Sequence, residues 1–496
     1  MYQITSILLI LIIIIIIIYT IKSKYYDVQI LNFNENINDN NNDYIDDVSQ
    51  FNKTKICQIF YPINKYDIIN IIDDAKNNNK KISMRGTKHS MGGHTIVNDG
   101  YIIDMANFNK IIEFDPDNYT ITVEPGITWS QLILFLDKYS LSPMTLQSYS
   151  SFSVGGTISV NAHGITNDYG IYNSVLKITI INSLGKEITC GRIKNFTLFS
   201  LIIGGYGLFG IITSVKLKLI NNSKLNLEFI KLNKYTFCDK YNSILNDDSI
   251  DIKIARININ NMNDIYLYVF RKQITNRKII SSVNKKNPEM SKLSQLLYKW
   301  ILPDTSFQKV RYKIENIIEK PIDIISDNYE RNLILYESAE PLAKLYNPII
   351  DINATHILQE FFIPPNNFLN WMNCLKYTFS QKYKYVTLLN ITIRYVKKDT
   401  ISFLNYATQD MYAFVLYYRL PKRISADNEL RKINQILTEK VIDLNGTFYL
   451  PYRHHYTKDQ LKKCYPQIDK FFEFKKYYDP IMLFSNQWSQ KFDNIN

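Results

Sequence analysis

Apolar and polar residues follow two periods along this chain, and the alternation of these periods predicts a mixed fold. In five segments apolar residues recur three and four positions apart, which is typical of amphipathic helices. These helices are predicted at residues 65–77, 128–139, 292–301, 366–382 and 426–444. Short runs rich in β-branched and aromatic residues, bounded by turn residues, predict strands. The strands are predicted at residues 55–61, 81–84, 101–104, 119–123, 175–182, 186–190, 211–220, 252–258, 265–270, 333–336, 358–363, 388–396 and 412–418. The expected fold class is α+β.

The first residues of the chain are far more apolar than the rest. Residues 4–21 carry no charge, and no small-residue cleavage site follows them. This pattern predicts a membrane anchor rather than a signal peptide that is removed. Lys22 and Lys24 flank the apolar run on its C-terminal side, which favours placing the rest of the chain on the cytoplasmic side. Residues 25–50 are acidic and rich in Asn, so we interpret them as a linker that cannot bury a core.

Charge and cysteine content exclude several classes of site. The formal net charge is +12, but the lysines are scattered and no nucleic-acid motif appears, so no nucleic-acid partner is expected. The five cysteines are dispersed and no pair has the spacing of metal ligands. We therefore expect neither a disulfide framework nor a metal site.

Glycine has a strongly uneven distribution. The chain has only 16 glycines, and most of them fall in three segments, 84–95, 153–164 and 203–213. Glycine permits positive φ and a close approach of the backbone to a ligand. The three segments are therefore predicted to be loops at strand ends that hold an anionic or planar ligand, with His89 in the first and His163 in the second.

The order of these segments resembles a known family. The motifs are Gly-x-x-His-Ser at 86–90, Val-Gly-Gly-Thr-Ile-Ser at 154–159 with Ala-His-Gly at 162–164, and Gly-Gly-x-Gly-x-Phe-Gly-Ile-Ile-Thr at 204–213. Together they resemble the FAD-binding domain of the vanillyl-alcohol oxidase / p-cresol methylhydroxylase (PCMH) superfamily. Within it the chain is similar to sugar-lactone and alditol oxidases, to cytokinin dehydrogenase and, near its C-terminus, to decaprenylphosphoryl-ribose oxidases. The resemblance covers most of the chain from about residue 55 onward.

This resemblance implies a domain organisation. It places a PCMH-type FAD-binding domain of two subdomains at 51–221, after the anchor at 1–24 and the linker at 25–50. An α+β substrate or cap domain follows at 222–445, where glycine is absent. Residues 446–496 are expected to return to the FAD-binding domain.

The resemblance also implies how FAD is held. Backbone amides of the three glycine segments are expected to reach the pyrophosphate and the ring. The residues implied are Arg85, Gly86, Thr87, Lys88, His89, Ser90, Ser153, Val154, Gly155, Gly156, Thr157, Ala162, His163, Gly164, Gly205, Gly207, Gly210 and Ile212. In histidylated relatives the motif histidine, here His89, bonds to the flavin 8α-methyl group. A non-covalent site remains the alternative, and the absence of Cys from 151–157 argues against a second, cysteinyl bond.

Three residues are candidates for the chemistry. Glu360 lies on a run that resembles the strand supplying a carboxylate in alditol oxidases, and Arg394 on another strand could stabilise an alkoxide. His454, adjacent to His455, is a further acid or base candidate. For each of them a solvated surface position is the alternative. Decaprenylphosphoryl-ribose oxidases carry a lysine where this chain has Tyr452, so their substrate is not expected here.

The function implied is an FAD-dependent oxidoreductase. It would transfer a hydride from a CH–OH group of a sugar, polyol or sugar lactone to flavin N5, with O₂ or another compound as the final acceptor. The alternatives are an amine dehydrogenase like cytokinin dehydrogenase, a C=C reductase, or a non-catalytic flavoprotein anchored in a membrane. No Rossmann fingerprint is present in usable form, so NAD is not expected.

Overall fold

The computed structural model describes residues 44–273, 279, 329–337 and 353–493. The predicted anchor, most of the linker and the predicted helix at 292–301 lie outside these residues. Within the described part of the chain, no helix combines the length and the apolarity that a membrane crossing requires. The elements described below belong to the compact unit Ile45–Asn496, except that the first strand, β1 (Tyr44–Ile45), begins one residue earlier.

A parallel three-stranded sheet holds the first glycine segment at the end of a strand. Its order is β3 (Gln58–Phe60), β5 (Tyr101–Asp104), β4 (Ile82–Arg85), and β2 (Thr54–Lys55) precedes it. Helix α2 (Lys65–Asn77) packs its apolar face on this sheet and starts at Asn64, which forms a capping box with Asp67. The C-terminal part of the chain returns here, because the Ile82 N–H donates to the Leu483 carbonyl at 2.9 Å.

A six-stranded antiparallel sheet carries the other two glycine segments. Its order is β10 (Glu187–Gly191), β9 (Val175–Ile181), β11 (Ile211–Asn221), β7 (Thr120–Val123), β6 (Ile111–Asp115), and β8 (Leu141–Pro143) pairs with β11. The helices of this region are α3 (Trp129–Asp137), α4 (Val154–Ser159) and α5 (Phe196–Ile202). Thr128 and Gln131 form a capping box that fixes the start of α3.

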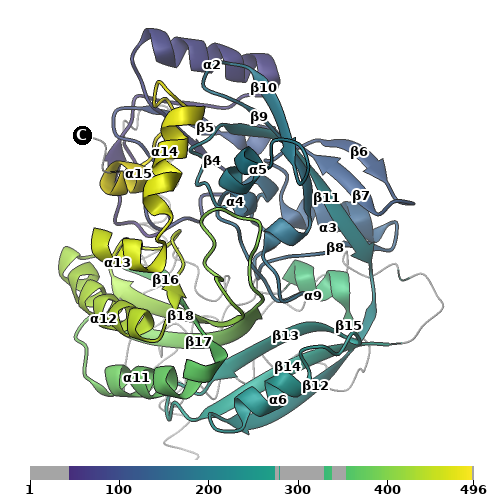
Figure 1. The fold of residues 1–496 in the computed structure, drawn as a ribbon, viewed down its shortest axis with the longest axis vertical. Helices are drawn as coiled ribbons and strands as arrows, with labels where there is room; N and C mark the ends of the chain where they lie inside the picture. The colour runs from purple at the N-terminus through teal and green to yellow at the C-terminus, as the bar shows by residue number, and fades with distance from the viewer. Residues whose placement is uncertain (1–43, 274–278, 280–328, 338–352, 494–496) are drawn as a thin grey trace, which may run out of the picture. The chain divides into compact units, whose positions relative to one another are not determined.

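An eight-stranded sheet forms the remainder (Figure 1). Its order is β15 (Tyr329–Glu330), β12 (Lys224–Asn233), β14 (Asp264–Lys272), β13 (Ile250–Ile257), β17 (Thr387–Val396), β18 (Met411–Pro421), β16 (Ala354–Ile363), β19 (Thr447–Phe448). Helices α6 (Phe237–Ser243), α11 (Phe368–Ser380) and α12 (Ile424–Asp443) lie along its outer face in Figure 1. Helices α13 (Lys458–Cys464), α14 (Ile468–Tyr478) and α15 (Gln487–Phe492) complete the chain. The other face of this sheet is free to meet the glycine segments.

Most of the predicted elements are confirmed, and three predictions are wrong. Residues 333–336 are not a strand but part of helix α9 (Arg331–Glu337), because Arg331 and Leu335, one helical turn apart, are both fully buried. The single strand predicted at 55–61 is divided between β2 and β3. The second glycine segment, predicted to be a loop, contains helix α4. These are places where packing with distant residues overrides local propensity.

Candidate active site

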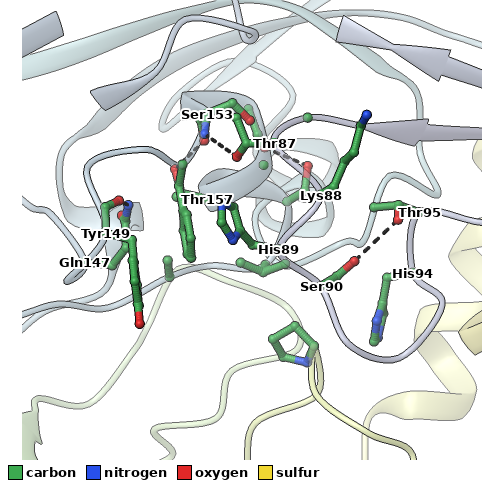
Figure 2. A pocket seen from close by; sticks show the side chains of 18 of the residues that line it. Thr87, Lys88, His89, Ser90, His94, Thr95, Gln147, Tyr149, Ser153 and Thr157 are labelled. Atoms are coloured by element: carbon green, nitrogen blue, oxygen red, sulfur yellow. Dashed lines mark hydrogen bonds between the residues drawn. The ribbon is translucent and has the colours of Figure 1, made fainter. Parts of the chain in front are cut away.

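The first two glycine segments are in direct contact. The Ser153 N–H donates to Thr87 Oγ1 at 3.2 Å, and Figure 2 shows this bond beside His89. A Cβ atom on Gly86 would lie 2.1 Å from Ser153 Oγ, so a side chain at residue 86 would force the Ser153 hydroxyl to move. Arg85, the last residue of β4, is buried and pairs with Asp104 of β5 at 2.7 Å, which fixes the strand end that leads into the segment.

The third glycine segment packs against the second. The Gly204 and Tyr206 N–H groups donate to the carbonyls of Ile158 and Ser159, each at 2.9 Å. A Cβ atom on Gly207 would lie 3.1 Å from the side chain of Met84, the first residue of the first segment. Gly207 also has a φ of +75°, a conformation that glycine adopts without strain. All three segments therefore converge.

A cavity of about 320 Å³ lies between these segments and the inner face of the eight-stranded sheet. Most of the residues that the sequence predicted for FAD line it. They are Arg85, Gly86, Thr87, Lys88, His89, Ser90, Ser153, Gly155, Gly156, Thr157, Ala162, His163, Gly207, Gly210 and Ile212. Three others do not line this cavity: Val154, Gly164 and Gly205. Val154 is buried in the apolar core, while Gly164 and Gly205 pack against backbone carbonyls of Leu146 and Leu201.

His89 is accessible from the cavity, and aromatic rings stand next to it. Its imidazole lies 4.1 Å from the Phe152 ring and 6.3 Å from the Tyr149 ring, between centroids. The surrounding protein desolvates the imidazole and lowers its pKa to about 4. At neutral pH the ring is therefore uncharged and keeps a free lone pair. The preceding residue, Lys88, has a φ of +64°, which turns the backbone sharply just before His89.

The inner face of the sheet contributes alternate residues of its strands, as the period of a strand requires. They are Ile254 of β13, Leu358 and Glu360 of β16, Asn390, Thr392 and Arg394 of β17, and Val415 and Tyr417 of β18. In the strand register Glu360 is opposite Val415, and Val415 is opposite Thr392. The candidate acid or base and the candidate cation thus come from neighbouring positions on one face.

Glu360 is held on both carboxylate oxygens. Its Oε1 lies 2.6 Å from His163 Nε2, and its Oε2 lies 3.5 Å from the Tyr452 hydroxyl. Both Glu360 and His163 are 2% exposed at the side chain. A buried carboxylate needs such partners, because an unpaired buried charge is costly. Glu360 is therefore buried, and the alternative of a solvated surface position is wrong for it.

One nitrogen of the Arg394 guanidinium is hydrogen-bonded to the protein, and another has no partner among the described residues. Its Nη2 donates to Ser148 Oγ at 2.6 Å, while the buried Nε has no hydrogen-bond partner among the described residues. Arg394 and Ser148 both line the cavity. The guanidinium therefore has donor capacity left for a bound oxygen atom.

His454 lies outside the cavity lining. It is packed between aromatic rings, with centroid distances of 5.0 Å to His94 and 5.7 Å to Phe492. Burial lowers its pKa well below the usual value. His455 is also buried, and its Nε2 lies 3.0 Å from Asp427 Oδ1. Neither histidine lines the cavity, whereas the other acid or base candidate, Glu360, does.

Several lining residues were not among the predicted site residues. They include His94, Gln147, Asn390, Thr392, Tyr417, Tyr449 and Tyr452. The strand period is the signal that could have found Asn390 and Thr392, since both share a face with Arg394. No local pattern marks Gln147, because its place depends on contacts between distant segments.

The lining fits a flavin dinucleotide. Glycine backbone at several positions allows close approach of a planar or anionic group. Buried polar atoms of the cavity lining that have no partner within the described residues include Gln147 Oε1, His163 Nδ1 and Arg394 Nε. Such atoms are normally satisfied by hydrogen bonds, so they are suited to the polar edge of a bound ligand.

Comparison with known proteins gives two family matches in order along the chain. The family described as "FAD binding domain" matches residues 58–191, and the family described as "D-arabinono-1,4-lactone oxidase" matches residues 265–492. The first match contains two of the glycine segments. The second contains both sheet residues singled out above, Glu360 and Arg394.

Individual relatives agree with these matches. L-gulonolactone oxidase of Mus musculus is 21% identical over 449 residues, which cover 88% of this chain and 96% of that protein. D-arabinono-1,4-lactone oxidase of Debaryomyces hansenii is 31% identical over 185 residues, covering 34% of this chain and 33% of the relative. Cytokinin dehydrogenase 3 of Oryza sativa is 31% identical over 144 residues, covering 28% of this chain and 27% of the relative.

The last two alignments thus span a third or less of the relatives' own length, whereas the first spans nearly all of it. Three observations indicate the same family: the glycine segments, the cavity between them and the sheet, and the two family matches. The chain belongs to the PCMH-type superfamily of FAD-linked oxidoreductases.

Proposed function

We propose that this chain oxidises a CH–OH group of a sugar lactone or a related sugar or polyol, with FAD as its cofactor. The observation that carries the proposal is that one cavity joins the glycine segments to Glu360 and Arg394. The match of residues 265–492 to the lactone oxidase family supports the substrate class. The alignment with L-gulonolactone oxidase supports it further, because it extends over both regions.

The residues can divide the chemistry between them. Bound FAD supplies the hydride acceptor. The Glu360 carboxylate accepts the proton of the substrate hydroxyl, and the Arg394 guanidinium stabilises the charge that develops on that oxygen. The aromatic walls formed by Tyr149, Phe152 and Tyr452 exclude water from the reacting atoms.

We further propose that His89 is the covalent attachment point of the flavin. A neutral imidazole is required to form an N–C bond, and the pKa of about 4 keeps His89 neutral at physiological pH. A fixed ring would hold the acceptor at a constant distance from the substrate. Denaturing the protein and digesting it should leave yellow colour on the peptide that contains His89. The His89→Ala variant should release all its flavin on denaturation, and a variant at His94 should not.

Amine oxidation of the kind suggested by the cytokinin dehydrogenase matches is the second candidate. Those matches cover between 28% and 32% of this chain. They therefore support a shared cofactor-binding region more than a shared substrate. The sheet that faces the cavity lies in the part matched by the lactone oxidase family, which favours CH–OH oxidation.

The test is anaerobic bleaching of the flavin with a panel of aldonolactones, polyols and amines. Lactones or polyols should bleach it, and Glu360→Gln should slow bleaching by about 10²- to 10⁴-fold. Glu439→Gln, the same substitution at an exposed position of α12, is the matched control and should bleach at the wild-type rate. Bleaching by amines alone would reject the proposed substrate class. Readmitting O₂ and measuring hydrogen peroxide then distinguishes an oxidase from an enzyme that needs another acceptor.

We also propose that residues 4–21 anchor the protein in a membrane with the catalytic body on the cytoplasmic side. The support is the uncharged apolar composition of this segment and the lysines that follow it. The full chain should sediment with membranes and require detergent for extraction. A chain without residues 1–24 should remain in the supernatant.

A further inference from the structure

The contact between His163 and Glu360 connects two distant parts of the chain. His163 follows helix α4 in the second glycine segment, and Glu360 lies on β16 of the eight-stranded sheet, 197 residues further on. The two side chains meet at 2.6 Å and are almost completely buried. The proposed function uses the carboxylate but gives His163 no task.

The hydrogen bonding of His163 indicates which of its nitrogens carries the proton. Nε2 faces the carboxylate, whereas Nδ1 is buried and has no partner among the described residues. A doubly protonated ring would bury an unsatisfied N–H at Nδ1, which is costly. The neutral tautomer with its proton on Nε2 satisfies Glu360 and leaves only a lone pair at Nδ1.

The backbone around His163 is fixed on both sides. The Tyr449 and Tyr406 hydroxyls donate to the carbonyls of Val160 and Asn161 at 2.7 and 2.9 Å. A Cβ atom on Gly164 would lie 1.6 Å from the Leu146 carbonyl oxygen, so the chain passes Leu146 where no side chain fits. His163 is thus held in place before any substrate binds, as a positioning group must be.

Aromatic rings restrict the imidazole itself. The centroids of Phe362, Tyr406 and Tyr449 lie 5.4, 5.5 and 6.0 Å from that of His163. Phe362 is two residues along β16 from Glu360, and the Tyr449 N–H donates to the Glu360 carbonyl at 3.0 Å. The elements that hold the imidazole therefore also hold the carboxylate.

We propose that His163 is the positioning residue of Glu360: its Nε2–H donates to Oε1, holds the carboxylate in place, and leaves Oε2 as the atom that receives the substrate proton. This inference rests on the proposed function. In the step itself the hydroxyl O–H bond breaks and its proton moves to Oε2. Bound flavin would accept the hydride, which is the hydrogen of the C–H bond together with its electron pair, and CH–OH would become C=O.

Among the described residues, His163 makes the shorter of the two side-chain hydrogen bonds that reach the Glu360 carboxylate. The titratable or charged side chains around it are His163, Tyr406, Tyr449, Tyr452 and Arg394. Burial raises the pKa of Tyr406, Tyr449 and Tyr452 well above the usual value, so all three stay neutral. The Tyr452 hydroxyl is 3.5 Å from Oε2, a longer and weaker contact than the one from His163.

His163→Gln and His163→Asn test the inference. Both introduce a side-chain amide, and the two amides differ only in the length of the side chain. In His163→Gln the side-chain N–H₂ lies where Nε2 lay and can still donate to Oε1. In His163→Asn the same group is one methylene shorter and cannot reach it. The bleaching rate is expected to fall on the acid side of its pH profile, here called the acid limb. In His163→Asn this fall should occur at a pH about one to two units higher than in wild type. In His163→Gln this acid limb should stay within half that shift of wild type.

A matched control lies on the same strand as Glu360. His356 does not line the cavity, and His356→Asn should leave the acid limb where it is in wild type. An acid limb that is unmoved in His163→Asn, while the protein is folded and holds flavin, would show that His163 only packs. Equal shifts in the Gln and Asn variants would overturn the donor role, since they would mean that the imidazole itself is needed.

A second readout needs no turnover. Infrared difference spectra of the oxidised protein, titrated with acid, should show a protonated carboxyl band that is missing in Glu360→Gln. That band should appear at a higher pH in His163→Asn than in wild type or His163→Gln. If no lactone or polyol bleaches the flavin, the proposed function fails while this titration still decides whether His163 controls Glu360.

Discussion

Gly86 and Ser153 stand so close that a Cβ atom on Gly86 would lie 2.1 Å from Ser153 Oγ. This approach brings the turn that carries His89 against the turn that begins helix α4. The wall of the cavity is formed by this junction, and the Ser153 N–H bond to Thr87 closes it. The absence of a side chain at residue 86 therefore favours the close contact that forms this wall of the cavity.

Gly86→Ala is expected to lower the amount of flavin that the protein retains. The added methyl group must displace Ser153, at a cost of about 1–3 kcal/mol, or about 5- to 150-fold in the affinity for flavin before the proposed bond to His89 forms. The flavin-to-protein absorbance ratio after gel filtration measures this. Ser153→Ala in the same chain should restore part of the flavin, because the atom that clashes is then gone. Full flavin content in Gly86→Ala would show that the turn can move.

Arg394 is expected not to tolerate lysine. Its Nη2 bonds to Ser148 Oγ at 2.6 Å while Nε remains available, and a single ammonium group cannot reproduce both directions. We compare the ratio of the bleaching rate constant to the substrate dissociation constant. Arg394→Lys should reduce this ratio about 10²-fold. Ser148→Ala should reduce the same ratio less than about tenfold, since it removes only a hydrogen bond that orients Arg394. Stopped-flow bleaching measures both, and a lysine variant with wild-type kinetics would contradict the role given to Arg394.

The buried ion pair between Arg331 and Asp251 is expected to matter for stability. Arg331 is fully buried at the start of α9, and Asp251 on β13 is its charged partner. Asp251→Ala leaves this guanidinium without a counter-charge and should lower the free energy of unfolding by about 3–5 kcal/mol. Asp247→Ala, which breaks the more exposed pair with Arg271, is the control and should have a much smaller effect. Equal effects in urea titrations would contradict the prediction.

His94 is expected to make the protein less stable in mild acid. Burial lowers its pKa to about 3, so the folded protein keeps it neutral, while the unfolded chain protonates it near the usual value of 6.5. Between these two values the unfolded state binds more protons, and stability therefore falls as the pH falls from about 6.5 towards 3. His94→Phe should show a shallower loss of stability between pH 7 and 5 than wild type. Urea unfolding at both pH values measures the free energy of unfolding. An equal change in this free energy between pH 7 and 5 in the two proteins would contradict the prediction.

The sequence by itself determined the elements whose signals are local. The bounds of α2 were predicted correctly because its apolar period and the capping residues Asn64 and Asp67 lie within one segment. Thr128 marked the start of α3 in the same way. The clustering of glycine indicated the three segments that line the cavity, since glycine is required wherever backbones approach this closely.

Tertiary structure alone decided which polar residues meet. Glu360, Arg394 and His454 looked alike along the chain, yet the first two face the cavity and His454 is enclosed by aromatic rings. Residues 333–336 have the composition of a strand, but burial of Arg331 and Leu335 makes them helical. The bond between His163 and Glu360 joins residues 197 positions apart. No local pattern encodes such a contact, because it follows from packing the second glycine segment against the eight-stranded sheet.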